Sequence, residues 1–235
     1  MIKIKAVILA AGRGVRLRPL TFDTPKPLLK INNKPILEHN LDQLIRLVDE
    51  VIIIVGYKAE MIKEYFGNQY KGIKITYIIQ EKQLGTAHAL LQAKGRLQGR
   101  FIVMNGDDLY NKYDIENCLK KEIAILAKVV GDPSRFGVLV VEGGLVTDII
   151  EKSPNPPSKL ANTGLYVLND DIFSLLEDVE LSERGEYELT DAIKELIIVE
   201  DVEYVPVKKY WISISNIKEI EMAEKELKKY EGSEK

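Results

Sequence analysis

The stretch "KAVILAAGRGVRLRPLTFDTPKPLL" (residues 5–29) joins an apolar run of strand length to a loop that holds Gly12 and Gly14. The loop also carries four cationic side chains, Arg13, Arg16, Arg18 and Lys26. In an open α/β sheet a ligand binds beyond the carboxyl ends of the strands, which is where this loop would emerge. Because glycines let backbone N–H groups turn towards an anion, the stretch predicts a site for a phosphate chain.

Two common phosphate-binding loops do not account for this stretch. The P-loop requires a Gly-Lys-Ser/Thr ending, which is absent, and the dinucleotide fingerprint requires a third glycine where Leu17 stands. A lone Gly-x-Gly is also common in solvated turns. The rest of the chain must therefore identify the ligand.

Apolar runs and helical patterns alternate in the first half of the chain. The runs "KAVILA", "VIIIVGY", "IKITYIIQ" and "FIVMNGD" are separated by expected helices over residues 35–48, 60–66 and 86–94. Such alternation is typical of βαβ units. We expect an α/β, Rossmann-like fold with a mostly parallel central sheet and helices on both faces.

After about residue 124 the pattern changes to short strands, "AILAKVV", "RFGVLVV", "LVTDIIEK" and "LANTGLYVLN". They predict a small mixed or antiparallel extension of the sheet. A helix near residues 189–198 and the strand "VEYVPVK" follow. Asn216 and Glu219 then form a capping-box pattern that opens a final helix.

Length and composition indicate one ordinary soluble domain. The 235 residues are 46% hydrophobic and 29% charged, with a net charge of -3, which indicates no nucleic-acid surface. A single cysteine, Cys118, excludes an internal disulfide, and no apolar run is long enough to span a membrane. We expect a cytoplasmic protein. Abundant Lys, Glu and Ile with scarce Cys and His favour a heat-adapted source.

The string "RLRPLTFDTPKPLL" closely resembles the signature of the sugar-1-phosphate nucleotidyltransferases, and further segments are similar to this family, in order, over residues 2–225. These enzymes join a nucleoside triphosphate to a sugar 1-phosphate and release pyrophosphate. The resemblance implies that Arg16 holds the leaving β and γ phosphates. It implies that Lys26 bridges the α-phosphate and the attacking group.

The segment "QEKQLGTAHAL" resembles the family's base-recognition segment, in which a Gln side chain and a Gly backbone address a pyrimidine. By this resemblance Gln80 and Gly85 take those roles, which implies dTTP or UTP rather than GTP. The nucleotide is expected to lie against Leu9, Ala11, Gly12, Gly14, Gln80, Gly85 and Thr86.

The segment "VMNGDDLY" ends an apolar strand with Asp107, which by resemblance binds Mg²⁺ between phosphate oxygens. An aspartate in an ordinary β-turn is the alternative for "GDD" alone. The family usually completes the metal site with the Asp of W-x-D-x-G-T. In "YWISISNI" the aligned Asp and Gly are Ser213 and Ser215, and Val15 replaces a common Thr or Ser. These departures predict reduced activity, with Ser213 facing Asp107 and with Asp108 as the alternative ligand.

The segments "RFGVLVVE", "IIEKSPNPPS" and "ANTGLYVLN" resemble those that form the sugar-1-phosphate pocket. The resemblance implies that Gly137 offers a backbone N–H. Glu151 and Asn162 are expected to bind sugar hydroxyls, and Lys152 to face the phosphate.

Two other functions stay open. The chain could be a catalytically weak or inactive regulatory homologue that binds nucleotide and sugar phosphate, or a cytidylyltransferase that acts on choline phosphate or a polyol phosphate. We expect one nucleotidyltransferase domain over residues 1–228 and a flexible tail over residues 229–235. No C-terminal β-helix acyltransferase domain is expected. The sequence predicts neither the sugar nor the oligomeric state.

Overall fold

The computed structural model describes residues 4–231. Its strands are β1 (Lys5–Ala10), β2 (Lys30–Ile31), β3 (Lys34–Pro35), β4 (Glu50–Val55), β5 (Gln69–Tyr70), β6 (Ile73–Ile79), β7 (Phe101–Asn105), β8 (Asp108–Tyr110), β9 (Ala124–Val129), β10 (Gly137–Glu142), β11 (Leu145–Glu151), β12 (Leu160–Leu168), β13 (Glu203–Pro206) and β14 (Trp211–Ser213). Its α-helices are α1 (Ile36–Leu44), α2 (Ala59–Phe66), α3 (Thr86–Leu91), α4 (Lys112–Leu119), α5 (Ile172–Glu177), α6 (Leu189–Val199) and α7 (Ile217–Glu231). Short 3-10 helices are η1 (Val15–Leu17), η2 (Lys26–Leu28) and η3 (Pro133–Arg135).

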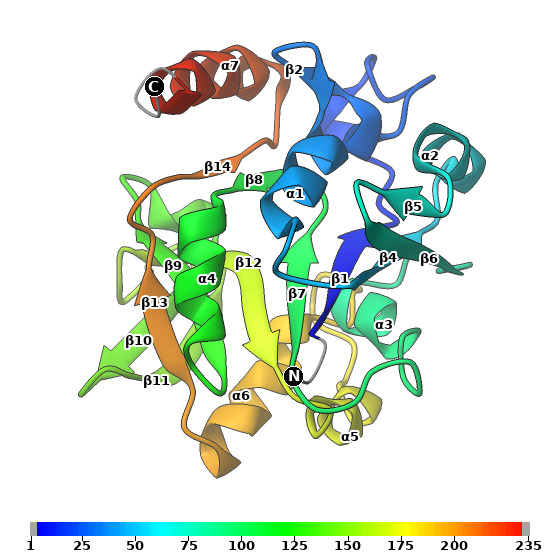
Figure 1. The fold of residues 1–235 in the computed structure, drawn as a ribbon. Coiled ribbons are helices and arrows are strands. Elements are labelled where there is room, and N and C mark those ends of the chain that lie inside the picture. The colour runs from blue at the N-terminus through cyan, green and yellow to red at the C-terminus, as the bar shows by residue number, and fades with distance from the viewer. Residues whose placement is uncertain (1–3, 232–235) are drawn as a thin grey trace.

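A ten-stranded sheet runs through the molecule in the order β10-β11-β13-β9-β12-β7-β1-β4-β6-β5 (Figure 1). Neighbouring strands β7, β1, β4 and β6 are parallel. Strand β12 is antiparallel to both β7 and β9, and β10 and β11 form an antiparallel hairpin. The expected α/β fold with a mixed extension is therefore confirmed as a mixed α/β fold. Parallel pairing is limited to β7, β1, β4 and β6 and to the pair β13 and β9, because β12 runs antiparallel between β7 and β9, so the Rossmann-like description itself is not confirmed.

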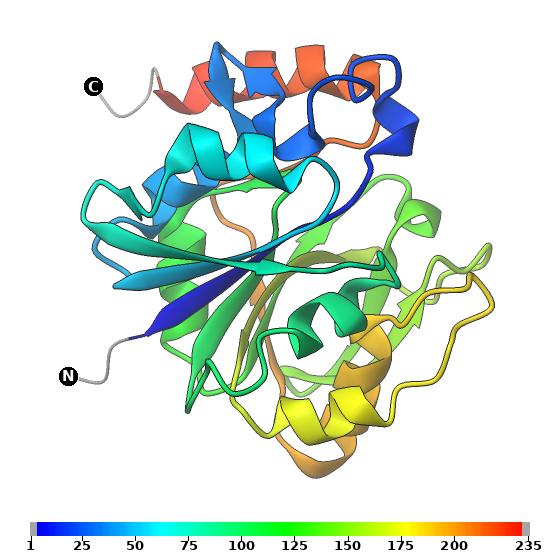
Figure 2. The ribbon, with the colours of Figure 1, turned by 90° about the vertical axis from the view of Figure 1, so that its right-hand side faces the viewer.

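Helices cover both faces of this sheet (Figures 1 and 2). Side chains alternate between the faces along a strand, so that the neighbours Val7 and Ile8 of β1 enter different cores. Helices α1, α2 and α4 pack on the core that holds Ile8, and α3, α5 and α6 pack on the core that holds Val7. The two cores reach the carboxyl end of β1, where Ala10 and Ala11 belong to one core each, and the signature loop begins directly after them.

A third, smaller core lies under α7, which runs beside the β2–β3 hairpin (Figure 2). Leu17 and Leu29 of the signature loop share this core with Ala223 and Leu227 of α7. The last helix is therefore part of the support of the first loop. It remains helical to Glu231, three residues beyond the expected boundary, and residues 232–235 lie outside the described residues.

The expected start of α7 at Asn216 is confirmed, but only one of the two hydrogen bonds of the capping box is formed in the standard way. The Asn216 side chain accepts a hydrogen bond from the Glu219 backbone N–H at 3.1 Å. The Glu219 carboxylate returns to the N–H of Ser215 at 2.6 Å, one residue earlier than the standard motif. This shift brings Ser215 into contact with the helix start.

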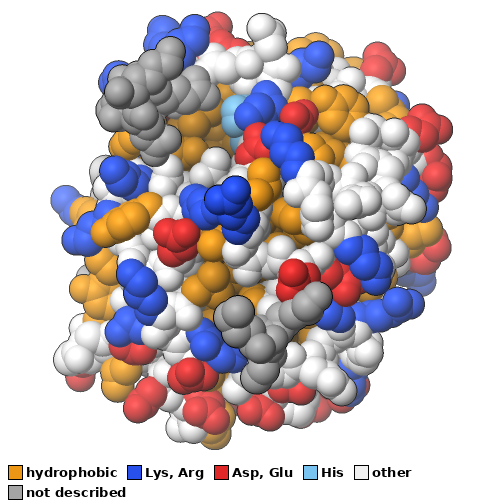
Figure 3. All heavy atoms as spheres, viewed as in Figure 1, with side chains coloured by type: hydrophobic (Ala, Val, Ile, Leu, Met, Phe, Trp, Pro, Cys, Tyr) orange, Lys and Arg blue, Asp and Glu red, His pale blue; other side chains and the backbone are white. Residues whose placement is uncertain are grey.

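The helix expected over residues 35–48 is shorter than the periodicity predicts, because α1 ends at Leu44. Pro35 pairs with Lys30 in the β2–β3 hairpin, and Arg46 has a φ of 68°, which no α-helix can contain. None of the helices in residues 4–231 is long and apolar enough to cross a membrane. On the face drawn in Figure 3, acidic and basic side chains are intermixed.

Candidate active site

The signature loop folds around Gly14 at the carboxyl end of β1. Gly14 has a φ of 59°, and its carbonyl oxygen accepts hydrogen bonds from Leu17 N at 2.9 Å and Thr21 Oγ1 at 2.8 Å. A Cβ at Gly14 would lie 3.0 Å from the Thr21 side chain, so the turn favours glycine twice, through conformation and through space. A Cβ at Gly12 would meet nothing within 4 Å. The loop therefore has a fixed base and an open tip.

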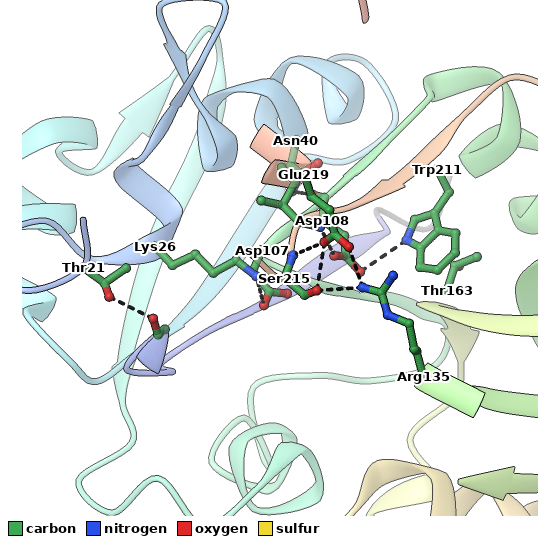
Figure 4. A network of polar contacts seen from close by, with 12 residues as sticks. Thr21, Lys26, Asn40, Asp107, Asp108, Arg135, Thr163, Trp211, Ser215 and Glu219 are labelled. Carbon is green, nitrogen blue, oxygen red and sulfur yellow. Dashed lines mark hydrogen bonds and ion pairs between the residues drawn. The ribbon is translucent and has the colours of Figure 1, made fainter. Parts of the chain in front are cut away.

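Lys26 and Asp107, expected from separate motifs, meet at this loop (Figure 4). Lys26 Nζ lies 2.6 Å from Asp107 Oδ2, and the lysine side chain is only 8% exposed whereas that of Asp107 is 42% exposed. The ammonium group of Lys26 is therefore buried, and its partner Asp107 is accessible to solvent. Arg16 lies exposed on η1 and forms no ion pair with the other described residues. Its charge is available to a ligand.

Asp108 has a different role from its neighbour. Its carboxylate is buried and accepts hydrogen bonds from the Trp211 indole N–H at 3.2 Å and the Ile214 backbone N–H at 3.3 Å. Burial, reinforced by the charge of Asp107, raises the pKa of Asp108. Since both oxygens already serve β14 and the turn after it, Asp108 is a poor alternative ligand for a metal. The antiparallel register also sets Ser213 opposite Asp108, not Asp107 as expected.

A second group of polar contacts joins the turn between β14 and α7 to η3, which precedes β10 (Figure 4). Arg135 Nη2 donates to Ser215 Oγ at 2.9 Å and forms an ion pair with Glu219. Burial alone would raise the pKa of Glu219. The hydrogen bonds from Ser215 and Arg135 outweigh this effect, so the pKa lies below its usual value. The Phe136 ring packs edge-on to Trp211, with 5.2 Å between centroids. The hydroxyl of Ser215, where the family has glycine, thus takes part in the network.

The residues expected to hold the sugar phosphate gather around Glu151. A Cβ at Gly137 would lie 2.6 Å from Glu151 Oε2, so any larger residue there would displace the end of this side chain. Lys152 Nζ lies 3.2 Å from Glu151 Oε1, and Arg184 Nη1 lies 3.1 Å from the same oxygen. Arg184 Nη1 is also 3.1 Å from Glu188 Oε1. Two partly exposed cations therefore surround one carboxylate.

Arg184 and Glu188 are site residues that the sequence reasoning missed. They belong to "RGEYELTD" (residues 184–191), which leads into the helix expected near residues 189–198. Glu188 is 7% exposed, and burial raises its pKa, although Arg184 opposes this rise. The signal was present in the sequence, because two acidic residues and an arginine immediately before an apolar helix are more charge than capping requires.

Asn162 lies buried on β12 and is engaged within its own strand. Its Nδ2 donates to the Tyr166 hydroxyl at 2.7 Å, and its Oδ1 accepts from the Gly164 N–H at 3.0 Å. These contacts hold the irregularity between Asn162 and Tyr166 in the pairing with β9. One Nδ2 hydrogen remains for a ligand, so the expected contact with a sugar hydroxyl stays a prediction.

The expected base-recognition residues meet the "RGEYELTD" segment. Gly85 has a φ of 112° and a ψ of 178°, and a Cβ there would lie 2.4 Å from the Tyr187 carbonyl oxygen. Thr86 Oγ1 accepts the N–H of Leu189 at 2.9 Å. Gln80 is 3% exposed and its carboxamide nitrogen donates to the Gly85 carbonyl at 3.1 Å. The expected base-recognition segment is thus in direct contact with the segment that carries Arg184 and Glu188.

Leu9 and Ala11 contribute backbone rather than side chain to the junctions around the loop. The Leu9 carbonyl accepts the N–H of Gly106 at 2.9 Å, and the Ala11 carbonyl accepts the N–H of Tyr57 at 3.1 Å. The ends of β1, β4 and β7 are therefore tied together at one edge. Within residues 4–231, no three His, Cys, Asp or Glu side chains group closely enough to hold a metal ion by themselves.

Comparison with known proteins identifies the class that this arrangement belongs to. A family model of nucleotidyl transferases matches residues 5–229, so the chain belongs to the nucleotidyl transferase family. It is 44% identical over 207 residues to the bifunctional protein GlmU of Methanocaldococcus jannaschii, across 88% of this chain and 50% of that protein. It is 41% identical over 204 residues to the UTP–glucose-1-phosphate uridylyltransferase AglF of Haloferax volcanii, across 83% and 84%. The chain spans about half the length of the GlmU proteins it matches.

Solved structures with the same fold agree. A Bacillus anthracis protein assigned as a glucose-1-phosphate thymidylyltransferase superposes with a TM-score of 0.85 at 28% identity, over 94% of each chain. A UDP-glucose pyrophosphorylase complexed with UDP-glucose gives a TM-score of 0.87 over 97% of this chain, and its 22% identity makes this a likeness of fold. The resemblance seen in the sequence is therefore confirmed.

Proposed function

We propose that this protein joins a nucleoside triphosphate, UTP or dTTP, to a sugar 1-phosphate and so produces a nucleotide sugar and pyrophosphate. One observation carries the proposal. Lys26 and Asp107, 81 residues apart in the chain, meet at 2.6 Å beside an open glycine loop at the carboxyl ends of parallel strands. A buried ammonium next to an accessible carboxylate suits a phosphate chain with its counter-charge.

The nucleotide side supplies positive charge where the triphosphate reacts. A phosphate oxygen of the sugar 1-phosphate attacks the α-phosphorus in line, and pyrophosphate leaves, without a covalent protein intermediate. Lys26 stabilises charge at the α-phosphate. Arg16, exposed and without an ion pair in the described chain, binds the leaving β and γ phosphates. The backbone at Gly12, where a Cβ would meet nothing within 4 Å, offers its N–H group to a phosphate, and Gly14 makes the turn.

The sugar side combines hydroxyl ligands with cations. Glu151 and Asn162 accept or donate hydrogen bonds to sugar hydroxyls, and Gly137 offers its N–H. Lys152 and Arg184 have side chains 38% and 41% exposed, so the phosphate of the sugar substrate can reach both. When that phosphate binds, the two cations exchange part of their contact with Glu151 for contact with the phosphate, which releases the carboxylate for a hydroxyl.

The side chains at the site could bind Mg²⁺ through only one accessible carboxylate. Asp107 is the accessible carboxylate and would hold the ion together with phosphate oxygens, an arrangement that Mg²⁺ accepts because it commonly keeps waters and few protein ligands. When bound, the ion neutralises charge on the transferring phosphates. Since Ser213 provides no second carboxylate, the triphosphate itself must supply more of the ligands.

Pyrophosphate release from purified protein with Mg²⁺ tests the proposal. The panel pairs UTP, dTTP, CTP, ATP and GTP with glucose 1-phosphate, N-acetylglucosamine 1-phosphate, choline phosphate and a polyol phosphate. We expect release with UTP or dTTP and a sugar 1-phosphate. Lys26→Ala should abolish most of it, whereas Lys63→Ala, which removes a lysine from a surface pair on α2, should not.

Two results would contradict the proposal. Triphosphate binding with no pyrophosphate release from any pair in the panel would identify a regulatory homologue. The single accessible carboxylate at Asp107 is the observation that favours this alternative. Release confined to CTP with choline phosphate or a polyol phosphate would identify a cytidylyltransferase.

A further inference from the structure

The orientation of the Gln80 carboxamide is fixed by its two neighbours. Its Nε2 lies 3.1 Å from the carbonyl oxygen of Gly85 and 2.9 Å from Nδ1 of His88. An atom that close to a carbonyl oxygen must be a donor, so the nitrogen arm of the amide faces Gly85. The second N–H then points at His88 Nδ1. That nitrogen must carry the lone pair, and the ring proton lies on Nε2.

The oxygen arm of Gln80 is left for a ligand. Both hydrogens on Nε2 are committed inward, and Oε1 forms no hydrogen bond with the described residues, although it is not sealed from solvent. The buried side chain therefore presents an acceptor and no donor. Uracil and thymine carry a hydrogen on N3 beside the 4-carbonyl group, whereas N3 of cytosine is itself an acceptor.

His88 is held independently of Gln80. It lies on α3, and Gln92 one turn later donates its side-chain nitrogen to the His88 carbonyl oxygen at 3.0 Å. The same nitrogen is 3.5 Å from His88 Nε2, but both of these nitrogens carry hydrogens in this tautomer, so this approach is not a hydrogen bond. Gln92 thus bonds the backbone of the helix, and His88 is the side chain that receives the second N–H of Gln80.

We propose that His88 is a specificity-determining residue that acts through Gln80. By accepting the second N–H, it keeps the carboxamide oxygen turned towards the base, so that the site selects uracil or thymine triphosphates and rejects cytosine. This inference rests on the proposed function in one respect, the place of Gln80 in the base site. Cytosine would lose one hydrogen bond and leave two acceptors facing each other, which corresponds to about 10- to 100-fold weaker binding.

Binding measurements separate this inference from catalysis. Calorimetry gives the dissociation constants of UTP, dTTP and CTP for the wild-type chain and three variants. His88→Leu removes the acceptor and should reduce the UTP-to-CTP preference about tenfold, since the freed carboxamide can turn. His88→Asn restores an acceptor near the position of Nδ1 and should restore the preference. Gln92→Leu, the matched control on the same helix, should leave the preference unchanged.

The outcomes are distinct. A preference that is equal in the wild type, His88→Leu and His88→Asn would overturn the role of His88 while the proposed function stood. A UTP-to-CTP preference that is lost in His88→Leu and kept in His88→Asn would support the role. A residue that merely fills space would give the same preference with an amide as with an alkyl group. Failure of all three triphosphates to bind the wild type would refute the proposed function, and the inference with it.

Discussion

Replacing Gly85 by alanine is expected to destabilise the protein more than any ordinary loop substitution. Gly85 adopts a φ of 112° and a ψ of 178°, a region of backbone space that is almost restricted to glycine. The added methyl carbon would also lie 2.4 Å from the carbonyl oxygen and 2.7 Å from the nitrogen of Tyr187. Because both contacts are with backbone, the segment must move.

The magnitude follows from these two effects. A residue held in such a strained conformation costs on the order of 1–3 kcal/mol. Moving the Tyr187 backbone also weakens its hydrogen bonds with Leu84 O and Ala87 N, at 2.8 and 2.9 Å, each with a net contribution of about 1 kcal/mol. We therefore expect Gly85→Ala to lower the free energy of unfolding by roughly 3–5 kcal/mol.

Urea unfolding of Gly85→Ala and Gly95→Ala provides the measurement and its control. Gly95 also has a positive φ, 82°, but a Cβ there would meet nothing within 4 Å, so its replacement should cost only about 1–2 kcal/mol of backbone strain. The reasoning would be refuted if the two variants differed by less than about 1 kcal/mol, which is the contribution of a single hydrogen bond. A fall in UTP affinity should accompany the loss in Gly85→Ala alone, because the Gly85 carbonyl holds Gln80.

Three further predictions concern charge. Lys26→Ala and Arg16→Ala should each lower turnover about 100- to 1000-fold with little change in unfolding free energy, and wild-type pyrophosphate release in both would exclude the proposed roles. Ser213→Asp should lower the Mg²⁺ concentration that gives the half-maximal rate, and an unchanged Mg²⁺ titration would contradict this prediction. The variant should also destabilise the metal-free protein, because the new carboxylate stands opposite Asp108. Glu50 is expected to stabilise the fold above pH 4.5: burial raises its pKa, but one hydroxyl and two lysine ammonium groups lower it more, to about 2. This contribution should disappear as the pH falls from about 4.5 to about 2, so acid unfolding curves of wild type and Glu50→Gln should converge there.

The sequence predicted the features that depend on local periodicity. Strand β1 lies where the apolar run indicated, because both of its faces are buried, and helix α2 lies where the helical pattern indicated, because it buries one face. It did not predict the direction of β12, since direction depends on which strands become neighbours after folding. Likewise β8 and β14 were missed, because three-residue strands have no periodicity to read.

The candidate site was predictable where residues act in a short motif. The loop with Lys26 and the strand end with Asp107 could be recognised separately, but their 2.6 Å contact required the fold. Asp108 illustrates the opposite case. It looks like a second exposed carboxylate in "GDD", and only the burial under Trp211 reveals that it is a structural acceptor. Arg184 was missed because its contact with Glu151, 33 residues away in the chain, required the fold.

The small core beneath α7 has a consequence for how the protein is made. Leu17 and Leu29 leave the ribosome long before the apolar surface that covers them, because Ala223 and Leu227 come much later in the sequence. The parallel strands β1, β4 and β6 can associate long before that moment. During translation the signature loop therefore lacks this part of its support until α7 has emerged.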